Sequence, residues 1–166
     1  MNHLFLVRTG IYGPDGRLDN RGRLETGLLG KDIKDILNGS SAHIITSSAP
    51  RAVDSAQEIA ECLNIDLESL EKIQYLWFGT DSPELDSPRD CRFRKPDLER
   101  IMKIVDMRKE RAEGIIIVSH LEVTDAFPAY FLSNYLGVNS CLRKLYTGQA
   151  VHFDLTNKSF QYLPKD

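Results

Sequence analysis

Three short apolar runs set the strongest limit on how this chain can fold. They span His3–Arg8, Ala42–Thr46 and Gly114–Ser119, they are rich in Ile, Val, Leu and Phe, and they do not alternate with polar residues. A strand with one solvated face alternates, whereas a strand covered on both faces reads as a continuous apolar run. We therefore expect a parallel sheet with helices on both of its faces.

Helical patterns accompany these runs. In each pattern, apolar residues recur three or four positions apart, which is the spacing of one face of a helix. The first stripe comprises Leu24, Leu28, Leu29, Ile33, Ile36 and Leu37, and it is predicted to end near Asn38-Gly39. The others comprise Ala52, Ala56, Ile59, Ala60 and Leu63 after Pro50, Leu98, Ile101, Met102 and Val105 after Pro96-Asp97, and Val123, Ala126, Phe127, Tyr130 and Phe131. In the last helix, Pro128 must lie in the first turn or kink the helix.

The C-terminal part predicts a hairpin. Ala150–Leu155 and Ser159–Leu163 read as strands joined by a turn at Thr156-Asn157-Lys158. Together with the alternating strands and helices, this predicts a three-layer α/β/α sandwich with a mostly parallel central sheet and an antiparallel edge strand. A chain of 166 residues is expected to form a single domain, residues 1–166. Tyr75–Arg94 is a predicted long loop, either a functional lid or an irregular connection.

Composition limits the functional classes. The chain holds 21 Lys and Arg against 24 Asp and Glu, a net charge of −3 that argues against a general nucleic-acid or membrane-surface binder. No apolar run approaches the roughly 20 residues of a membrane span, and the N-terminus does not have the pattern of a signal peptide. Cys62, Cys91 and Cys141 form no close-spaced pair, which favours a reducing compartment and predicts neither disulfides nor a zinc site. We expect a cytoplasmic protein.

Polar residues follow each of the three apolar runs. Arg8 ends the first run, Ser47 and Arg51 follow the second, and His120 follows the third. Ligands in open α/β sheets bind at the carboxyl ends of the strands, so two guanidinium groups and one imidazole are predicted at one edge of the sheet. The set suits a phosphoryl group, because Arg matches two oxygens and a protonated His120 would add positive charge. Taken singly, Arg8 is more often a surface ion-pair partner and His120 a satisfied buried histidine.

These residues lie in three short motifs, which read Arg8-Thr9-Gly10, Ser47-Ser48-Ala49-Pro50-Arg51-Ala52 and Ser119-His120-Leu121. Together they resemble the histidine phosphatase superfamily of phosphoglycerate-mutase-like proteins, which has Arg-His-Gly, then Ser-Pro-x-x-Arg-Ala, then Ser-His. The short bacterial phosphohistidine phosphatases look most similar, since they also carry Ser-His-Leu and a turn like Thr147-Gly148-Gln149-Ala150. The resemblance spans residues 3 to about 155, with Pro50 displaced by two residues from the family pattern.

The largest departure from the family is Thr9. The resemblance implies that the residue at position 9 accepts the phosphoryl group covalently, that His120 is catalytic, and that the substrate is bound by Arg8, Gly10, Ser47 and Arg51. A threonine hydroxyl is a poor nucleophile unless a base removes its proton, and its phosphate ester would hydrolyse slowly. Loss of a covalent nucleophile costs roughly 10³- to 10⁶-fold in rate, so activity by the family mechanism is expected to be weak or absent.

An acidic loop supplies the proton donor in this family, and the local candidates here are Asp81, Glu84 and Asp86. The competing interpretation is a solvated acidic loop. Trp77 and Phe78 in the same segment either cap the pocket or pack at the base of the loop. No metal and no cofactor are expected, because the family chemistry uses histidine and arginine alone.

Two functions from different classes fit these residues. The first is a phosphomonoester or phosphohistidine phosphatase that works around Thr9, for instance by direct attack of water. The second is a pseudophosphatase that binds phosphate, a phosphorylated protein or a phosphorylated small molecule without hydrolysing it. Arg8, Arg51 and His120 support both equally, whereas Thr9 favours binding or residual activity. A phosphoglycerate mutase is a weaker alternative, because such enzymes also need the phosphohistidine and are usually longer.

Overall fold

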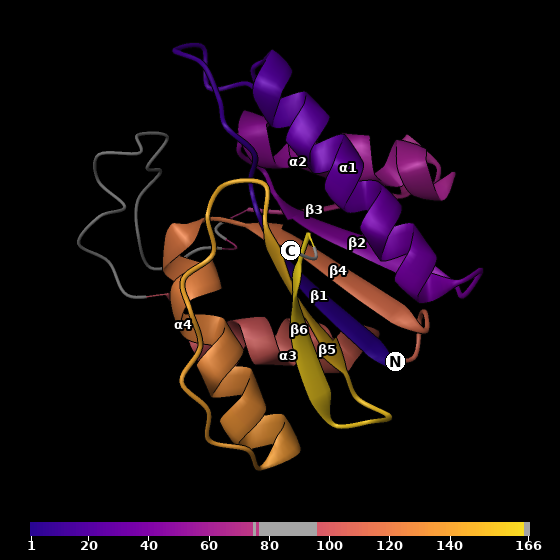
Figure 1. The fold of residues 1–166 in the computed structure, drawn as a ribbon, viewed down its shortest axis with the longest axis vertical. Helices are drawn as coiled ribbons and strands as arrows, with labels where there is room; N and C mark the ends of the chain where they lie inside the picture. Colours follow the sequence, from indigo (N-terminus) through magenta and orange to yellow (C-terminus); the bar gives the residue numbers. More distant parts are fainter. Residues whose placement is uncertain (75, 77–95, 165–166) are drawn as a thin grey trace.

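Six strands form one sheet in the computed structural model, which describes residues 1–74, 76 and 96–164 (Figure 1). The strands lie in the order β3-β2-β4-β1-β5-β6, and their bounds are β1 His3–Arg8, β2 Ala42–Ser47, β3 Glu71–Ile73, β4 Gly114–Ser119, β5 Ala150–Asp154 and β6 Ser159–Leu163. Strands β1 to β4 pair in parallel, while β5 pairs antiparallel with both β1 and β6. The predicted mostly parallel sheet with an antiparallel edge is confirmed.

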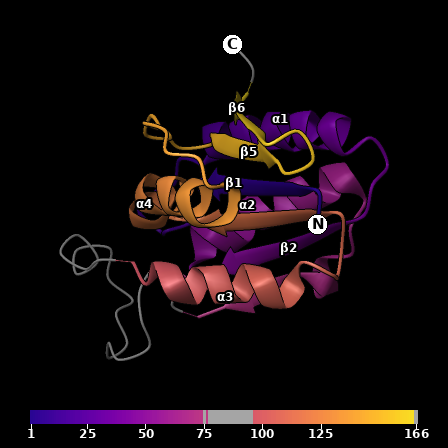
Figure 2. The same cartoon turned by 90° about the horizontal axis from the view of Figure 1, so that it is seen from below.

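Helices cover both faces of the sheet (Figures 1 and 2). They are α1 Asn20–Leu37, α2 Pro50–Leu63, α3 Leu98–Arg108 and α4 Leu121–Phe131, with a 3₁₀ turn η1 Leu67–Ser69 and a π-helical turn η3 Leu132–Leu136. Along β1, Phe5 and Val7 pack with α1 and α2, whereas Leu4 and Leu6 pack with α3 and α4. This two-sided burial is the reason why the strand sequences do not alternate. Among the described residues, no helix combines the length and the apolar character that crossing a membrane requires.

The helix boundaries follow the capping residues. The Asp19 carboxylate accepts a hydrogen bond from the Gly22 N–H at 2.7 Å at the start of α1, and the Asp97 side chain caps α3. Helix α1 ends at Asn38, whose φ of 46° is left-handed, as the sequence predicts. Pro128 lies inside α4 beyond its first turn, and the π-helical turn follows directly.

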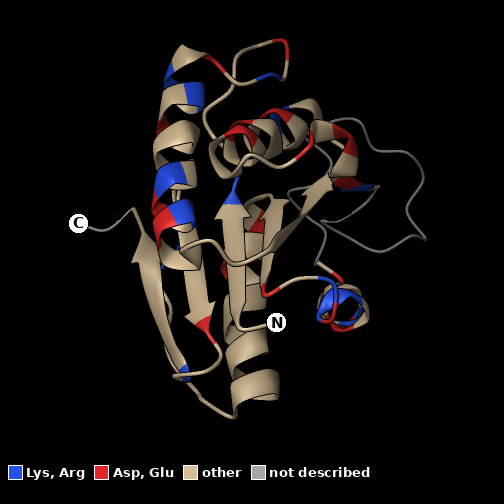
Figure 3. Cartoon of the chain, turned by 90° about the vertical axis from the view of Figure 1, so that its right-hand side faces the viewer, with Lys and Arg blue, Asp and Glu red and all other residues tan. Residues whose placement is uncertain are grey.

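The predicted apolar stripe of α1 is wrong at two positions. Leu24 and Leu28 are 66% and 51% exposed, and the buried face consists instead of Gly22, Thr26, Leu29, Gly30, Ile33 and Leu37. Glycines bring the helix close to its neighbours, since a Cβ at Gly30 would lie 3.0 Å from the side chain of Cys62 on α2. Basic and acidic positions are interspersed along the ribbon of α1 (Figure 3). Close backbone approach at the glycines, together with Leu29, Ile33 and Leu37, therefore defines the inner face.

An ion-pair cluster links the short edge strand β3 to the C-terminal end of α3. The Glu71 carboxylate accepts hydrogen bonds from the Arg108 guanidinium, including Nε at 2.8 Å, and lies 2.8 Å from His43 Nε2. Arg111 adds a weaker pair at 3.4 Å. The Arg108 hydrogen bonds, with a smaller contribution from His43, lower the pKa of Glu71 to about 2. The cluster therefore holds a charged carboxylate at a strand too short to be predicted from a pattern.

Glu71→Gln is expected to lower the free energy of unfolding by about 2 kcal/mol at pH 7. Because the folded-state pKa is depressed, the stabilisation is fully present above the ordinary value of 4.5 and is lost as the pH falls toward 2. Urea unfolding from pH 7 down to pH 3 should therefore show that the difference in free energy of unfolding between wild type and variant becomes smaller below pH 4.5. Glu68→Gln, at an exposed position in η1, is the control and should remain within about 0.5 kcal/mol of wild type. A gap that is constant with pH would contradict this role of Glu71.

Candidate functional site

Thr9 lies just beyond the carboxyl end of β1 and is held by backbone on both sides. Its N–H donates to the Ser119 carbonyl at 3.1 Å, and its carbonyl accepts from the Gly148 N–H at 3.1 Å. The residue is 4% exposed. Within the described part of the chain, the Thr9 hydroxyl has no hydrogen-bonded base. The residue predicted to stand at the nucleophile position is thus firmly placed, but no described group activates its hydroxyl.

Gly10 is explained by close packing. A Cβ there would lie 2.7 Å from Thr26 Oγ1 and 2.9 Å from the Gly22 carbonyl, both on α1. The Gly10 N–H donates to Ser55 Oγ at 3.1 Å, and that hydroxyl donates to the Arg51 carbonyl at 2.8 Å. Ser55, which the sequence analysis did not single out, therefore ties the end of β1 to the first turn of α2. A direct role of Gly10 in substrate binding stays a prediction.

The two predicted arginines come from the end of β1 and the start of α2. Arg8 donates from Nη1 to the Leu145 carbonyl at 2.6 Å. Arg51 is 8% exposed, and its guanidinium carbon lies 4.8 Å from the centre of the Tyr12 ring. This cation–π contact covers one face of the guanidinium. A cation in the first turn of a helix is disfavoured by the helix dipole, and a bound anion would offset that cost.

His120 lies between β4 and α4, where its imidazole meets β2. Nε2 is 2.9 Å from Ser47 Oγ, and the two residues are 4% and 1% exposed. Burial lowers the pKa of His120 well below its ordinary value of 6.5, and the charges of Arg51 and Arg8 lower it further. The imidazole is therefore neutral at pH 7, and it would add the positive charge considered from the sequence only when protonated. A phosphate dianion would favour its protonated form.

The structure brings Arg8, Ser47, Arg51 and His120 together at the carboxyl edge of the sheet, and we call these four residues the arginine–histidine cluster. Thr9 adjoins it through the backbone. The predicted proton donors Asp81 and Glu84, together with Asp86, Trp77 and Phe78, lie outside the described residues. Within residues 1–74, 76 and 96–164, no three side chains of His, Cys, Asp or Glu are grouped so that they could hold a metal ion.

Asp54 supports the site and was not singled out from the sequence. This residue of α2 is 1% exposed, and its carboxylate accepts a hydrogen bond from the Leu18 N–H at 3.2 Å. It also forms ion pairs with Arg17 at 2.7 Å and Arg23 at 3.4 Å. These contacts anchor the loop that carries Tyr12 over the cluster. No local pattern distinguished Asp54 from Glu58 and Glu61 on the same helix.

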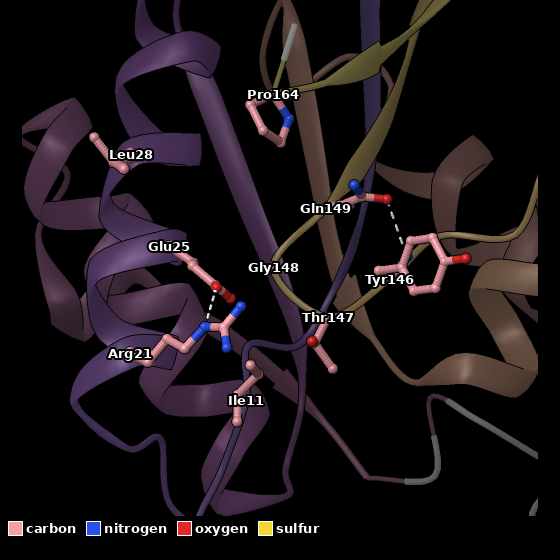
Figure 4. A pocket seen from close by; sticks show the side chains of 9 residues that line it. All are labelled: Ile11, Arg21, Glu25, Leu28, Tyr146, Thr147, Gly148, Gln149 and Pro164. Carbon is pink, nitrogen blue, oxygen red and sulfur yellow. Dashed lines mark hydrogen bonds and ion pairs between the residues drawn. The ribbon is translucent and has the colours of Figure 1, made fainter. Parts of the chain in front are cut away.

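A separate pocket of about 480 Å³ lies between α1 and the 145–149 turn (Figure 4). Its lining consists of Ile11, Arg21, Glu25, Leu28, Tyr146, Thr147, Gly148, Gln149 and Pro164. Arg21 and Glu25 pair with each other at 2.7 Å, and Gln149 Oε1 accepts from the Tyr146 N–H at 3.0 Å. Because the Gly148 N–H binds the carbonyls of Arg8 and Thr9, one backbone segment separates this pocket from the arginine–histidine cluster.

Comparison with known proteins identifies similar structures only. No family model matches the chain, and no curated protein matches its sequence. The protein histidine phosphatase SixA complexed with tungstate is 18% identical, with a TM-score of 0.63 over 96% of this chain and 93% of that chain. The putative phosphohistidine phosphatase SixA from Agrobacterium tumefaciens is 14% identical, with a TM-score of 0.66 over 99% of each chain. A histidine-to-alanine mutant of phosphoserine phosphatase from Entamoeba histolytica, in complex with phosphoserine, is 18% identical, with a TM-score of 0.57 over 98% of this chain and 95% of that chain.

Structural matches at identities this low establish the fold and nothing further. The chain has the phosphoglycerate-mutase-like fold of these phosphatases over nearly its whole length. The resemblance predicted from the three motifs is confirmed at that level.

Proposed function

We propose that this protein is a phosphatase-like phosphate binder, with phosphomonoester or phosphohistidine chemistry that is weak or absent because of Thr9. One observation carries the proposal. Arg8, Arg51 and the buried His120 lie at or just after the carboxyl ends of three parallel neighbouring strands, and the two guanidinium charges help to lower the pKa of His120. Gathering like charges around a buried group is costly, and an anion at this edge of the sheet would offset the cost.

The expected ligand is a phosphoryl group on a protein or a small molecule. Arginine provides planar, charge-assisted donors that match two phosphate oxygens, and the Arg51 donors lie beside the neutral His120. Solved structures of the same fold that contain tungstate or phosphoserine support this ligand class. In the phosphoserine complex a histidine had been replaced by alanine, which supports binding without a full set of histidines.

The alternative is a pseudophosphatase that captures a phosphorylated partner without hydrolysis. It is favoured by the Thr9 hydroxyl, which has no hydrogen-bonded base among the described residues. In both alternatives we propose that the chain forms a single domain, residues 1–166, and that this domain binds the ligand. For both we propose a cytoplasmic location, which three cysteines without a close-spaced pair favour.

Arg51→Met is expected to weaken the binding of inorganic phosphate by about 30-fold, because a charge-assisted hydrogen-bond donor is worth about 2 kcal/mol. Isothermal titration calorimetry at low ionic strength measures the dissociation constant. Arg111→Met is the matched control, since Arg111 is exposed and precedes the opposite, amino end of β4. Equal phosphate affinity in the wild type and both variants, or no binding by the wild type, would refute the proposed function.

A further inference from the structure

Ser47 and His120 form a hydrogen-bonded pair inside the cluster. Their side chains meet because β2 and β4 are parallel neighbours whose carboxyl ends lie at the same edge. The Oγ–Nε2 distance is 2.9 Å, and both residues are almost fully buried. A serine hydroxyl on an imidazole nitrogen is the arrangement that converts a weak nucleophile into a competent one.

The surroundings of the pair set the direction in which its proton can move. Ser47 Oγ already accepts the Ala49 N–H at 3.4 Å, so its own proton can point to His120. His120 is neutral because burial and the nearby arginines lower its pKa, so one ring nitrogen carries a lone pair. With the ring proton on Nδ1, Nε2 accepts the Ser47 proton. No described base contacts the Thr9 hydroxyl in this way.

We propose that Ser47, activated by His120, accepts the phosphoryl group in place of the missing family nucleophile. This inference rests on the proposed phosphate-binding function. Ser47 Oγ gives its proton to His120 Nε2 as the Oγ–P bond forms and the bond from phosphorus to the leaving oxygen breaks. The leaving oxygen keeps the electron pair of that bond and takes the proton from His120.

Release of phosphate completes the cycle slowly. Water attacks phosphorus and gives a proton to His120 Nε2, the Oγ–P bond breaks, and Ser47 Oγ recovers the proton. The Arg8 and Arg51 charges stabilise the phosphoryl oxygens in both steps. A phosphoserine ester is more stable than the phosphoramidate of a histidine, so the adduct accumulates and the second step limits turnover.

Rapid mixing with dinitrophenyl phosphate tests the inference. The wild type is expected to release a burst of dinitrophenolate of at most one equivalent, followed by slow turnover. Peptide mass spectrometry of the quenched protein should locate the phosphoryl group on Ser47. Ser47→Ala should slow the burst by about 100-fold or more. Ser69→Ala is the control, since Ser69 is an exposed serine in η1, and it should retain the burst.

The site of labelling decides the outcome even if Ser47→Ala folds poorly. An acid-stable, alkali-labile adduct mapped to Ser47 supports the inference. An acid-labile adduct on His120, an adduct on Thr9, or no adduct in a protein that binds inorganic phosphate would each overturn it and leave the proposed function standing. A wild-type protein that binds no phosphate would overturn both.

Discussion

Thr9→His is expected to raise the hydrolysis of a phosphohistidine peptide and of an aryl phosphate by about 10³-fold or more. The substitution supplies an imidazole nucleophile beside Arg8, at the end of β1. The Thr9 side chain makes no hydrogen bond in the described structure, so its removal breaks none, while the backbone bonds to Ser119 and Gly148 remain available. Phosphate release under saturating substrate measures the gain.

Thr9→Asn is the matched control for this experiment, because asparagine adds a polar side chain of intermediate size without a nucleophilic nitrogen. It should remain as slow as wild type. The adduct in Thr9→His should also change from acid-stable to acid-labile, because the phosphoryl group would move from an oxygen to a nitrogen. Equal rates in Thr9→His and Thr9→Asn would mean that position 9 does not limit catalysis.

Gly22→Ala is expected to destabilise the protein by roughly 3 kcal/mol. A Cβ on Gly22 would lie 2.0 Å from the Ile11 carbonyl oxygen, which also accepts the Asp19 N–H at 3.2 Å. The Ile11 atoms that the Cβ would meet are all backbone and no side chain can turn aside, so α1 must move away from the segment that follows Gly10. Urea unfolding measures the loss of stability, and weaker phosphate binding should accompany it because this segment leads into the cluster.

Gly27→Ala is the control on the same helix, and it should have the opposite effect. A Cβ there would meet nothing within 4 Å, so the variant gains helix propensity without a clash. The expected gain is about 0.5–1 kcal/mol. Changes in the free energy of unfolding that have the same sign for Gly22→Ala and Gly27→Ala would contradict the close approach of α1 to Ile11.

The strands and helices could be predicted because their signals are local. Continuous apolar runs identified β1, β2 and β4, and each is buried on two faces in the structure. The antiparallel hairpin of β5 and β6 was also predicted correctly. The three motifs then sufficed to predict the fold, because they occur along the chain in the same order as in the histidine phosphatases that they resemble.

The supporting residues could not be predicted, because their contacts join segments far apart in the sequence. Ser55 binds the Gly10 backbone and Tyr12 covers Arg51, and neither pair has a local pattern. Leu24 and Leu28 were assigned to the core because periodicity reports apolar character, not how closely two backbones approach. Strand β3 was missed because three residues are too few for a pattern.

The sequence by itself determined the α/β architecture and the positions of Arg8, Arg51 and His120 at strand and helix ends. It also determined that position 9 is a threonine and not a histidine. Hydrophobic periodicity and residue identity are properties of the chain alone, which is why they could be read in advance. Only the tertiary structure decided that His120 is neutral and that Ser47 is its hydrogen-bond partner. Protonation and hydrogen bonding depend on burial and on distances across the sheet, and these exist only once the strands have assembled.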